Sequence, residues 1–176
     1  MKEDFKNLSE DKLIKRFKNK RLVLFLLCLV MIILVLSFSV FSITELVNNT
    51  DLAKYAGDLF TEVVTLCFLI TGFVFIIQLM NIKDENIIEE GMRLEKTIGK
   101  RGVLFIILSV YLISYSVAIY ATLISEYLLR RLILASITIS MSIPSFILGL
   151  LLLQTNALFY NYKKWGFIWR KSFLKS

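Results

Sequence analysis

The sequence contains no histidine, one proline and only two cysteines among its 176 residues. The absence of histidine removes the commonest general base and metal ligand of proteins. Cys28 and Cys67 lie in separate apolar stretches without CxxC spacing, a pattern typical of buried structural thiols. No catalytic, metal-binding or nucleotide-binding motif is present. We therefore expect neither enzymatic activity nor a cofactor.

Charge is missing from four long stretches of the chain, residues 22–43, 63–82, 102–125 and 132–153. Each is close to the roughly 20 residues that a helix needs to cross a hydrocarbon core of about 30 Å. The stretches are continuously apolar rather than alternating, which favours helices over the strands of a membrane barrel. The sequence thus predicts an all-α integral membrane protein, a bundle of four transmembrane helices.

The expected segments divide the chain into nine parts. In chain order they are a basic N-terminal amphipathic segment (1–21), a first span (22–44), an outer loop (45–58), a second span (59–82), an amphipathic cytoplasmic loop (83–101), a third span (102–125), a short outer turn (126–131), a fourth span (132–154) and an aromatic and basic tail (155–176). The first apolar run is longer than the roughly 7–15 residues of a signal-peptide core, so we expect it to remain as a span.

Basic residues are distributed unevenly between the two sides of this arrangement. With both ends and the 83–101 loop on one side, that side carries 18 of the 21 lysines and arginines. The positive-inside rule therefore predicts that both termini are cytoplasmic, in a cell membrane. Arg130 and Arg131 fall on the outer side and oppose this assignment; Glu126 stands four residues before Arg130 and is expected to pair with it. The lysines and arginines stand next to apolar runs that are long enough to cross a membrane. The expected partners are therefore anionic lipid headgroups and not nucleic acid.

Two segments outside the spans have amphipathic patterns. Ser9 is a good helix N-cap and predicts a short basic helix at the inner headgroup layer, the alternative being a disordered tail. In the 83–101 loop, Ile87, Gly91, Leu94 and Ile98 recur at helical spacing, and Gly99 is a candidate helix stop. This helix is expected to rest on the membrane or on the two terminal tails, the alternative being a docking site for a cytoplasmic partner.

The C-terminal tail holds both tryptophans of the chain. Tryptophan favours the headgroup interface and lysine and arginine meet anionic lipid there, so we expect an interfacial anchor. Its residues are Lys163, Lys164, Trp165, Trp169, Arg170 and Lys171.

Spans three and four carry the polar residues that suggest a site. In span three a heptad series runs Leu104, Leu108, Tyr111, Tyr115, Ala118, Thr122 and Ser125. Span four has a stripe of small residues, which let helix backbones approach closely, and the only proline, Pro144, which is expected to kink it. We expect the two tyrosines to face this stripe. The candidate groove consists of Tyr111, Ser114, Tyr115, Thr122, Thr138, Ser142, Ser145 and Gly149. It either packs the bundle or accepts a lipid headgroup or small amphiphile.

Three functions are compatible with these features. The first is a non-enzymatic accessory, assembly or self-protection subunit of a bacterial membrane, acting through helix–helix contacts in a homo- or hetero-oligomer. The second is a small oligomeric transporter or channel that handles a lipid or amphiphile through the candidate groove. The third is an intramembrane enzyme, for which the sequence supplies no constellation of reactive groups.

Overall fold

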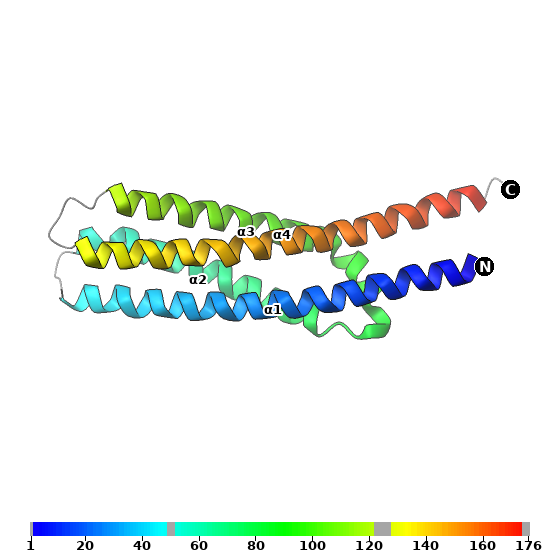
Figure 1. The fold of residues 1–176 in the computed structure, drawn as a ribbon, viewed down its shortest axis with the longest axis horizontal. Coiled ribbons are helices and arrows are strands. Elements are labelled where there is room, and N and C mark those ends of the chain that lie inside the picture. Colours follow the sequence, from blue (N-terminus) through cyan, green and yellow to red (C-terminus); the bar gives the residue numbers. More distant parts are fainter. Residues whose placement is uncertain (1, 49–51, 122–127, 174–176) are drawn as a thin grey trace.

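The computed structural model describes the backbone of residues 2–48, 52–121 and 128–173, and the side chains of residues 10–40, 59–120 and 131–164. Its elements are the helices α1 (Lys2–Asn48), α2 (Leu52–Met80), α3 (Ile87–Ala121) and α4 (Leu128–Phe173), with a short 3₁₀ turn, η1 (Asp84–Asn86), before α3. The described part contains no strand, which confirms the all-α class. The helices run side by side along one long axis, and α1 begins at the end where α4 finishes (Figure 1).

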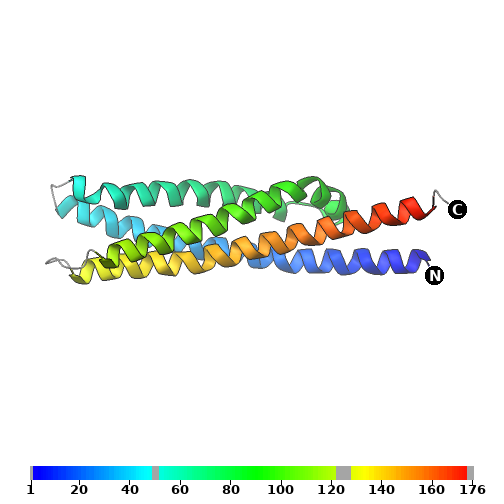
Figure 2. The same cartoon turned by 90° about the horizontal axis from the view of Figure 1, so that it is seen from above.

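The helices are longer than the apolar runs that they contain. α1 has 47 residues and α4 has 46, so each is about 70 Å long at 1.5 Å per residue. The start of α1 and the finish of α4 extend side by side beyond α3 and η1 (Figure 2). Ser9 is therefore not an N-cap, because it lies inside α1. Gly99 is not a helix stop either, because α3 continues through it. α4 likewise continues through Pro144.

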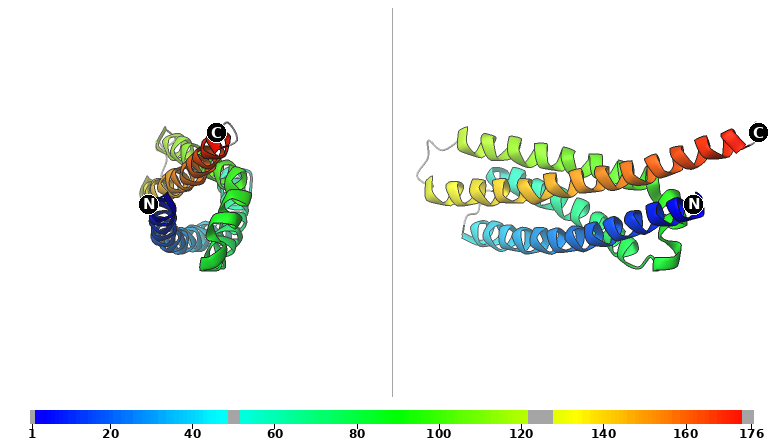
Figure 3. Two further views of the ribbon diagram at one scale, coloured as in Figure 1. Left: turned by 90° about the vertical axis from the view of Figure 1, so that its right-hand side faces the viewer. Right: turned by 45° about the vertical axis from the view of Figure 1, so that its right-hand side comes forward.

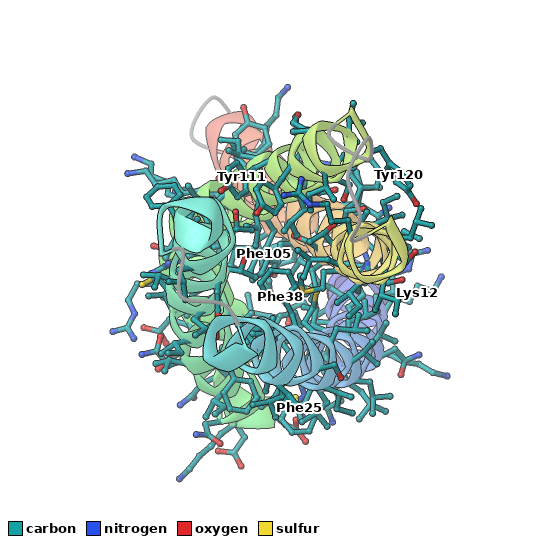
Figure 4. The ribbon with its side chains drawn as sticks, turned by 90° about the vertical axis from the view of Figure 1, so that its left-hand side faces the viewer. Lys12, Phe25, Phe38, Phe105, Tyr111 and Tyr120 are labelled. Carbon is teal, nitrogen blue, oxygen red and sulfur yellow. The ribbon has the colours of Figure 1, made fainter. Side chains whose placement is uncertain are left out.

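The four helices surround a common centre in the order α2, α1, α4, α3 (Figure 3). α3 and α4 pack together along much of their length, α1 contacts both α2 and α4, and α2 and α3 meet at few positions. Phe38 of α1 and Phe105 of α3 point into the interior and are almost fully buried (Figure 4). The α2–α3 side is therefore the loosest of the four.

Buried residues of α1 recur at alternating spacings of four and three. The series is Leu24, Cys28, Met31, Val35 and Phe38. This is the heptad spacing that keeps one face of a helix against its neighbours. Cys28 is buried as expected, whereas the expectation for Cys67 is wrong, because that thiol is exposed on the outer side of α2. The described helices leave Cys67 uncovered, so an apolar stretch does not by itself place a cysteine inside.

Each helix contains a stretch that is long and apolar enough to cross a membrane, by length and composition. Fewer than half of the residues in the most apolar window of each helix are buried in the structure. Their outward side chains are large and hydrophobic, for example Ile33 on α1, Ile70 on α2, Val117 on α3 and Ile143 on α4. The outside of the bundle is thus apolar on all four helices, as a lipid-facing surface is.

Arg21 of α1 binds the carbonyl groups at the C-terminal end of α2. Its Nη1 donates to the carbonyl oxygens of Met80 at 3.5 Å and Ile82 at 3.1 Å, and its Nη2 lies 3.6 Å from a carboxylate oxygen of Asp84. The same carboxylate pairs with Lys18 at 2.7 Å. Because the last carbonyls of a helix have no partner within it, these contacts fix both the end of α2 and the path into α3.

Arg21→Ala should lower the free energy of unfolding by about 1.5–3 kcal/mol, the usual contribution of hydrogen bonds to a charged group. Thermal unfolding in mild detergent, followed by far-UV circular dichroism, measures the change. Arg93→Ala is the control, because Arg93 is 73% exposed and its ion pair among the described residues is with Glu90 of its own helix. Equal midpoints for the two variants would show that Arg21 does not hold the α2 end.

Candidate functional site

The small-residue stripe of α4 is buried against α3. Thr138, Ser142 and Ser145 are at most 3% exposed, and Gly149 is buried as well. A side-chain carbon added at Gly149 would lie 2.8 Å from the carbonyl oxygen of Gly102 on α3. The two backbones are therefore in direct contact at this level, a separation that only glycine permits.

Serine hydroxyls continue this contact along the helices. Ser145 donates to the carbonyl oxygen of Phe105 at 2.8 Å, and Ser109 donates to the carbonyl oxygen of Ser142 at 2.9 Å. Further toward the end of α3, Ser116 is bonded to the hydroxyl of Thr138 and lies 3.4 Å from the carbonyl oxygen of Ala135. Each hydroxyl is thus engaged across or within the two helices. The structure shows a closed interface where the sequence suggested a groove.

A repeat of small residues at every seventh position underlies this interface. On α3 it runs Gly102, Ser109, Ser116, and on α4 it runs Ala135, Ser142, Gly149. The contacts between the helices pair Gly102 with Gly149, Ser109 with Ser142 and Ser116 with Ala135, as an antiparallel register requires. Only Ser142 and Gly149 of these six were predicted as site residues. A search for small residues at heptad spacing in both helices would have found the rest.

The tyrosines of the candidate groove lie elsewhere. The hydroxyl of Tyr111 bonds to the hydroxyl of Thr61 on α2, at 2.8 Å, and the ring of Tyr115 stacks on that of Tyr111 with centroids 6.3 Å apart. Figure 4 shows Tyr111 beside α2. The expectation that Tyr111 faces the α4 stripe is therefore wrong. Ser114 is exposed and donates to the carbonyl oxygen of Val110 in its own helix.

The buried face of α3 is shifted by one residue from the predicted heptad series. The buried residues on this part of α3 are Phe105, Leu108, Ser109, Leu112, Ser116 and Ile119. Leu108 of the predicted series is therefore buried as expected, whereas Leu104 and Ala118 are exposed. The other five buried residues each directly follow a predicted position. The period was right and the phase wrong, because the small side chains and not the tyrosines approach α4. Thr122 and Ser125 lie outside the described residues.

Tyr111→Phe should change stability little, because a hydrogen bond between membrane helices contributes about 0.6 kcal/mol on average. The ring and its stacking on Tyr115 remain. Thermal unfolding in detergent should place the variant within a few degrees of the wild type, and Tyr120→Phe, at an exposed position, should not differ from it. A complete loss of folded protein would mean that the Thr61 contact alone holds α2 to α3.

Polar groups appear again where α3 and α4 continue toward the chain ends. Glu95 is 8% exposed, and its carboxylate lies 3.7 Å from the ammonium of Lys163. The side-chain oxygen of Asn156 is buried and has no hydrogen-bond partner among the side chains and backbone that the structure describes. The amide nitrogen of Asn156 lies 2.7 Å from where a side-chain carbon at Gly99 would stand. This end of the α3–α4 interface is therefore polar, and its hydrogen bonds are incomplete. The serine contacts, by contrast, satisfy their hydroxyl groups.

An aromatic cluster joins the extensions of α1 and α4. Phe159 is fully buried, packs edge-on against Phe17 with centroids 5.3 Å apart, and fills the space over Gly91. Beyond it, the hydroxyl of Tyr162 donates to Glu10 at 2.5 Å. Burial, together with the Glu10 carboxylate, raises the pKa of Tyr162, outside the apolar runs, to about 12. The phenol therefore stays protonated and keeps this bond at neutral pH.

The expected interfacial anchor lies on this extension of α4. Lys163 and Lys164 are exposed, and the helix continues as far as Phe173. The side chains of Trp165, Trp169, Arg170 and Lys171 lie outside those that the structure describes. The anchor residues are thus carried on a helix that continues directly from the fourth apolar run, and not on a separate tail segment.

Among the residues that the structure describes, no group of three histidine, cysteine, aspartate or glutamate side chains is placed to hold a metal ion. An open depression on α3 is lined by Gly99, Lys100, Val103 and Leu104.

In comparisons with protein-family models, with curated proteins and with solved structures, no significant match to this chain was found.

Proposed function

We propose that this chain is a non-enzymatic, multi-pass protein of a bacterial membrane, with both termini cytoplasmic. In this proposal it acts through lateral helix–helix contacts as an accessory, assembly or self-protection subunit. The observation that carries the proposal is the division of the bundle into two kinds of surface. The polar hydroxyls of α3 and α4 are engaged inside, and large apolar side chains cover the outside of every helix.

Small residues on the outer face of α4 support a lateral contact. Ser136 and Ser140 are exposed, and each donates to the backbone carbonyl four residues earlier. Their hydroxyls are therefore satisfied in an apolar surrounding, and their small size leaves room for another backbone. Pairs of small residues four positions apart are a common feature of helix association in membranes. This face of α4 is the part of the outer surface best suited to a partner helix.

The transporter hypothesis has less support. A polar groove for a headgroup or amphiphile needs free donors or acceptors, and Ser109, Ser116, Ser142 and Ser145 are all bonded to the helices themselves. Tyr111 is bonded to Thr61. A transport route through these residues would have to break several of these bonds.

Co-purification from native membranes tests the proposal. The tagged chain, solubilised in mild detergent after brief crosslinking, should retain a stoichiometric membrane-protein partner or a second copy of itself. Ser136→Leu combined with Ser140→Leu should abolish the complex, and Ile143→Leu, at a 58% exposed position on the same helix, should leave it intact. A monomer carrying only lipid, with or without the substitutions, would contradict the proposal.

A further inference from the structure

One face of α3 changes from basic to apolar along its length. Lys96 and Lys100 are exposed, and Val103, Leu104 and Ile107 follow them on the same side of the helix, each at least 36% exposed. The open depression lies where the two parts meet. Positions four, seven, eight and eleven residues after Lys96 fall within about one third of the helix circumference, since each residue advances by 1/3.6 of a turn. The cations and the apolar side chains therefore form one continuous strip.

The two lysines are not engaged within the described part of the chain. Neither Lys96 nor Lys100 forms an ion pair or hydrogen bond there, whereas other cations at this end of the bundle do. Lys18 pairs with Asp84, and Lys20 donates to the side chain of Gln154 at 3.0 Å. Two ammonium groups one helical turn apart are thus available to an anion.

Gly99 is one of the residues that line the depression. The absence of a side chain there leaves room for the Asn156 carboxamide from α4, whose nitrogen occupies the adjoining space. Asn156 therefore fills the space over Gly99, and the two lysines supply the donors of this strip. Ammonium groups are hydrogen-bond donors, and phosphate oxygens are strong acceptors for them.

We propose that this strip, Lys96 to Ile107, binds one anionic phospholipid at the inner face of the membrane. The phosphate meets Lys96 and Lys100, and an acyl chain lies along Val103, Leu104 and Ile107. The apolar part selects a lipid over a free phosphate, because only the lipid has a chain to cover these side chains. The proposal rests on the proposed membrane location and adds a defined site to the general attraction of basic residues for anionic lipid.

Lipid binding to the full chain in nanodiscs of phosphatidylcholine with a minor fraction of phosphatidylglycerol tests the site. Native mass spectrometry of the released protein counts the retained lipids. K96Q combined with K100Q should weaken retention of phosphatidylglycerol by about thirtyfold, because each lysine beside anionic headgroups contributes about fivefold. K12Q combined with K83Q is the matched control: it removes the same charge from exposed lysines away from the strip, and retention should stay within about twofold.

Equal losses in the two double variants, or no loss in either, would overturn the site, since the attraction would then be diffuse or absent. Displacement of the lipid by an equal concentration of inorganic phosphate would overturn the role of the apolar strip. A chain that does not enter the nanodisc bilayer would contradict the proposed membrane location itself. That outcome is distinguishable from failure of the site, because in the latter case the chain enters the bilayer and binds both lipids alike.

Discussion

Replacing Gly149 by leucine should separate α3 from α4 and remove most of the monodisperse protein obtained in mild detergent. The first carbon of any side chain there would lie 2.8 Å from the carbonyl oxygen of Gly102 and 3.1 Å from the backbone nitrogen of Ile106. Backbone atoms cannot rotate away as a side-chain end can. Overpacking typically costs about 1–3 kcal/mol and occasionally more, and we expect Gly149→Leu to reach the upper end of this range or exceed it.

Leu150→Phe is the control for this prediction. Leu150 is the next residue of α4 and is 39% exposed, so a larger side chain there extends outward from the bundle. Its yield and elution profile should match the wild type. Gly149→Ala should fall between the two, because it adds only the first carbon. Equal yields for all three variants would mean that α3 and α4 are not in backbone contact.

Phe159→Ala should give the second large effect and loosen the extensions of α1 and α4 from each other. The side chain is fully buried between Phe17 and Gly91, so its removal leaves a cavity bordered by three helices. Truncation of a buried phenylalanine to alanine costs about 3–5 kcal/mol. Hydrogen exchange should show faster exchange in residues 10–21 and 155–164, and the apolar parts of the helices should remain protected.

Tyr160→Ala serves as the comparison, because Tyr160 neighbours Phe159 in sequence and is 53% exposed. It should leave the exchange pattern of both extensions unchanged. If Phe159→Ala were as protected as Tyr160→Ala, the two extensions would be independent helices, and the aromatic contact would not hold them together.

The sequence was sufficient to predict the helices but not which of their faces meet. Four uncharged runs sufficed for the all-α class, since length and continuity leave few other structures. The heptad spacing of span three could also be predicted. Which face of the helix meets α4 could not be predicted, because two adjacent series, one containing Tyr111 and the other Ser109, repeat with the same period. Contact with α4 decides between them, and the backbone approach at Gly102 and Gly149 favours the smaller residues.

The helix ends were misjudged for a related reason. Ser9 and Gly99 have the local chemistry of a cap and a stop, yet both lie inside helices. A glycine in a helix costs only about 1 kcal/mol, and tertiary packing readily offsets this. Phe17 and Phe159 provide such packing for the extensions, as Asn156 does over Gly99. These contacts join residues more than 50 positions apart, so no local pattern reports them.

Labelling of single cysteines in intact cells tests the central claim, a four-span bundle with both ends in the cytoplasm. Cys28 and Cys67 are first replaced by alanine, and one cysteine is then placed at position 12, 50 or 90. A membrane-impermeant maleimide should label position 50 in intact cells, and positions 12 and 90 only after the membrane is opened. Labelling of position 12 or 90 in intact cells, with position 50 protected, would contradict the account.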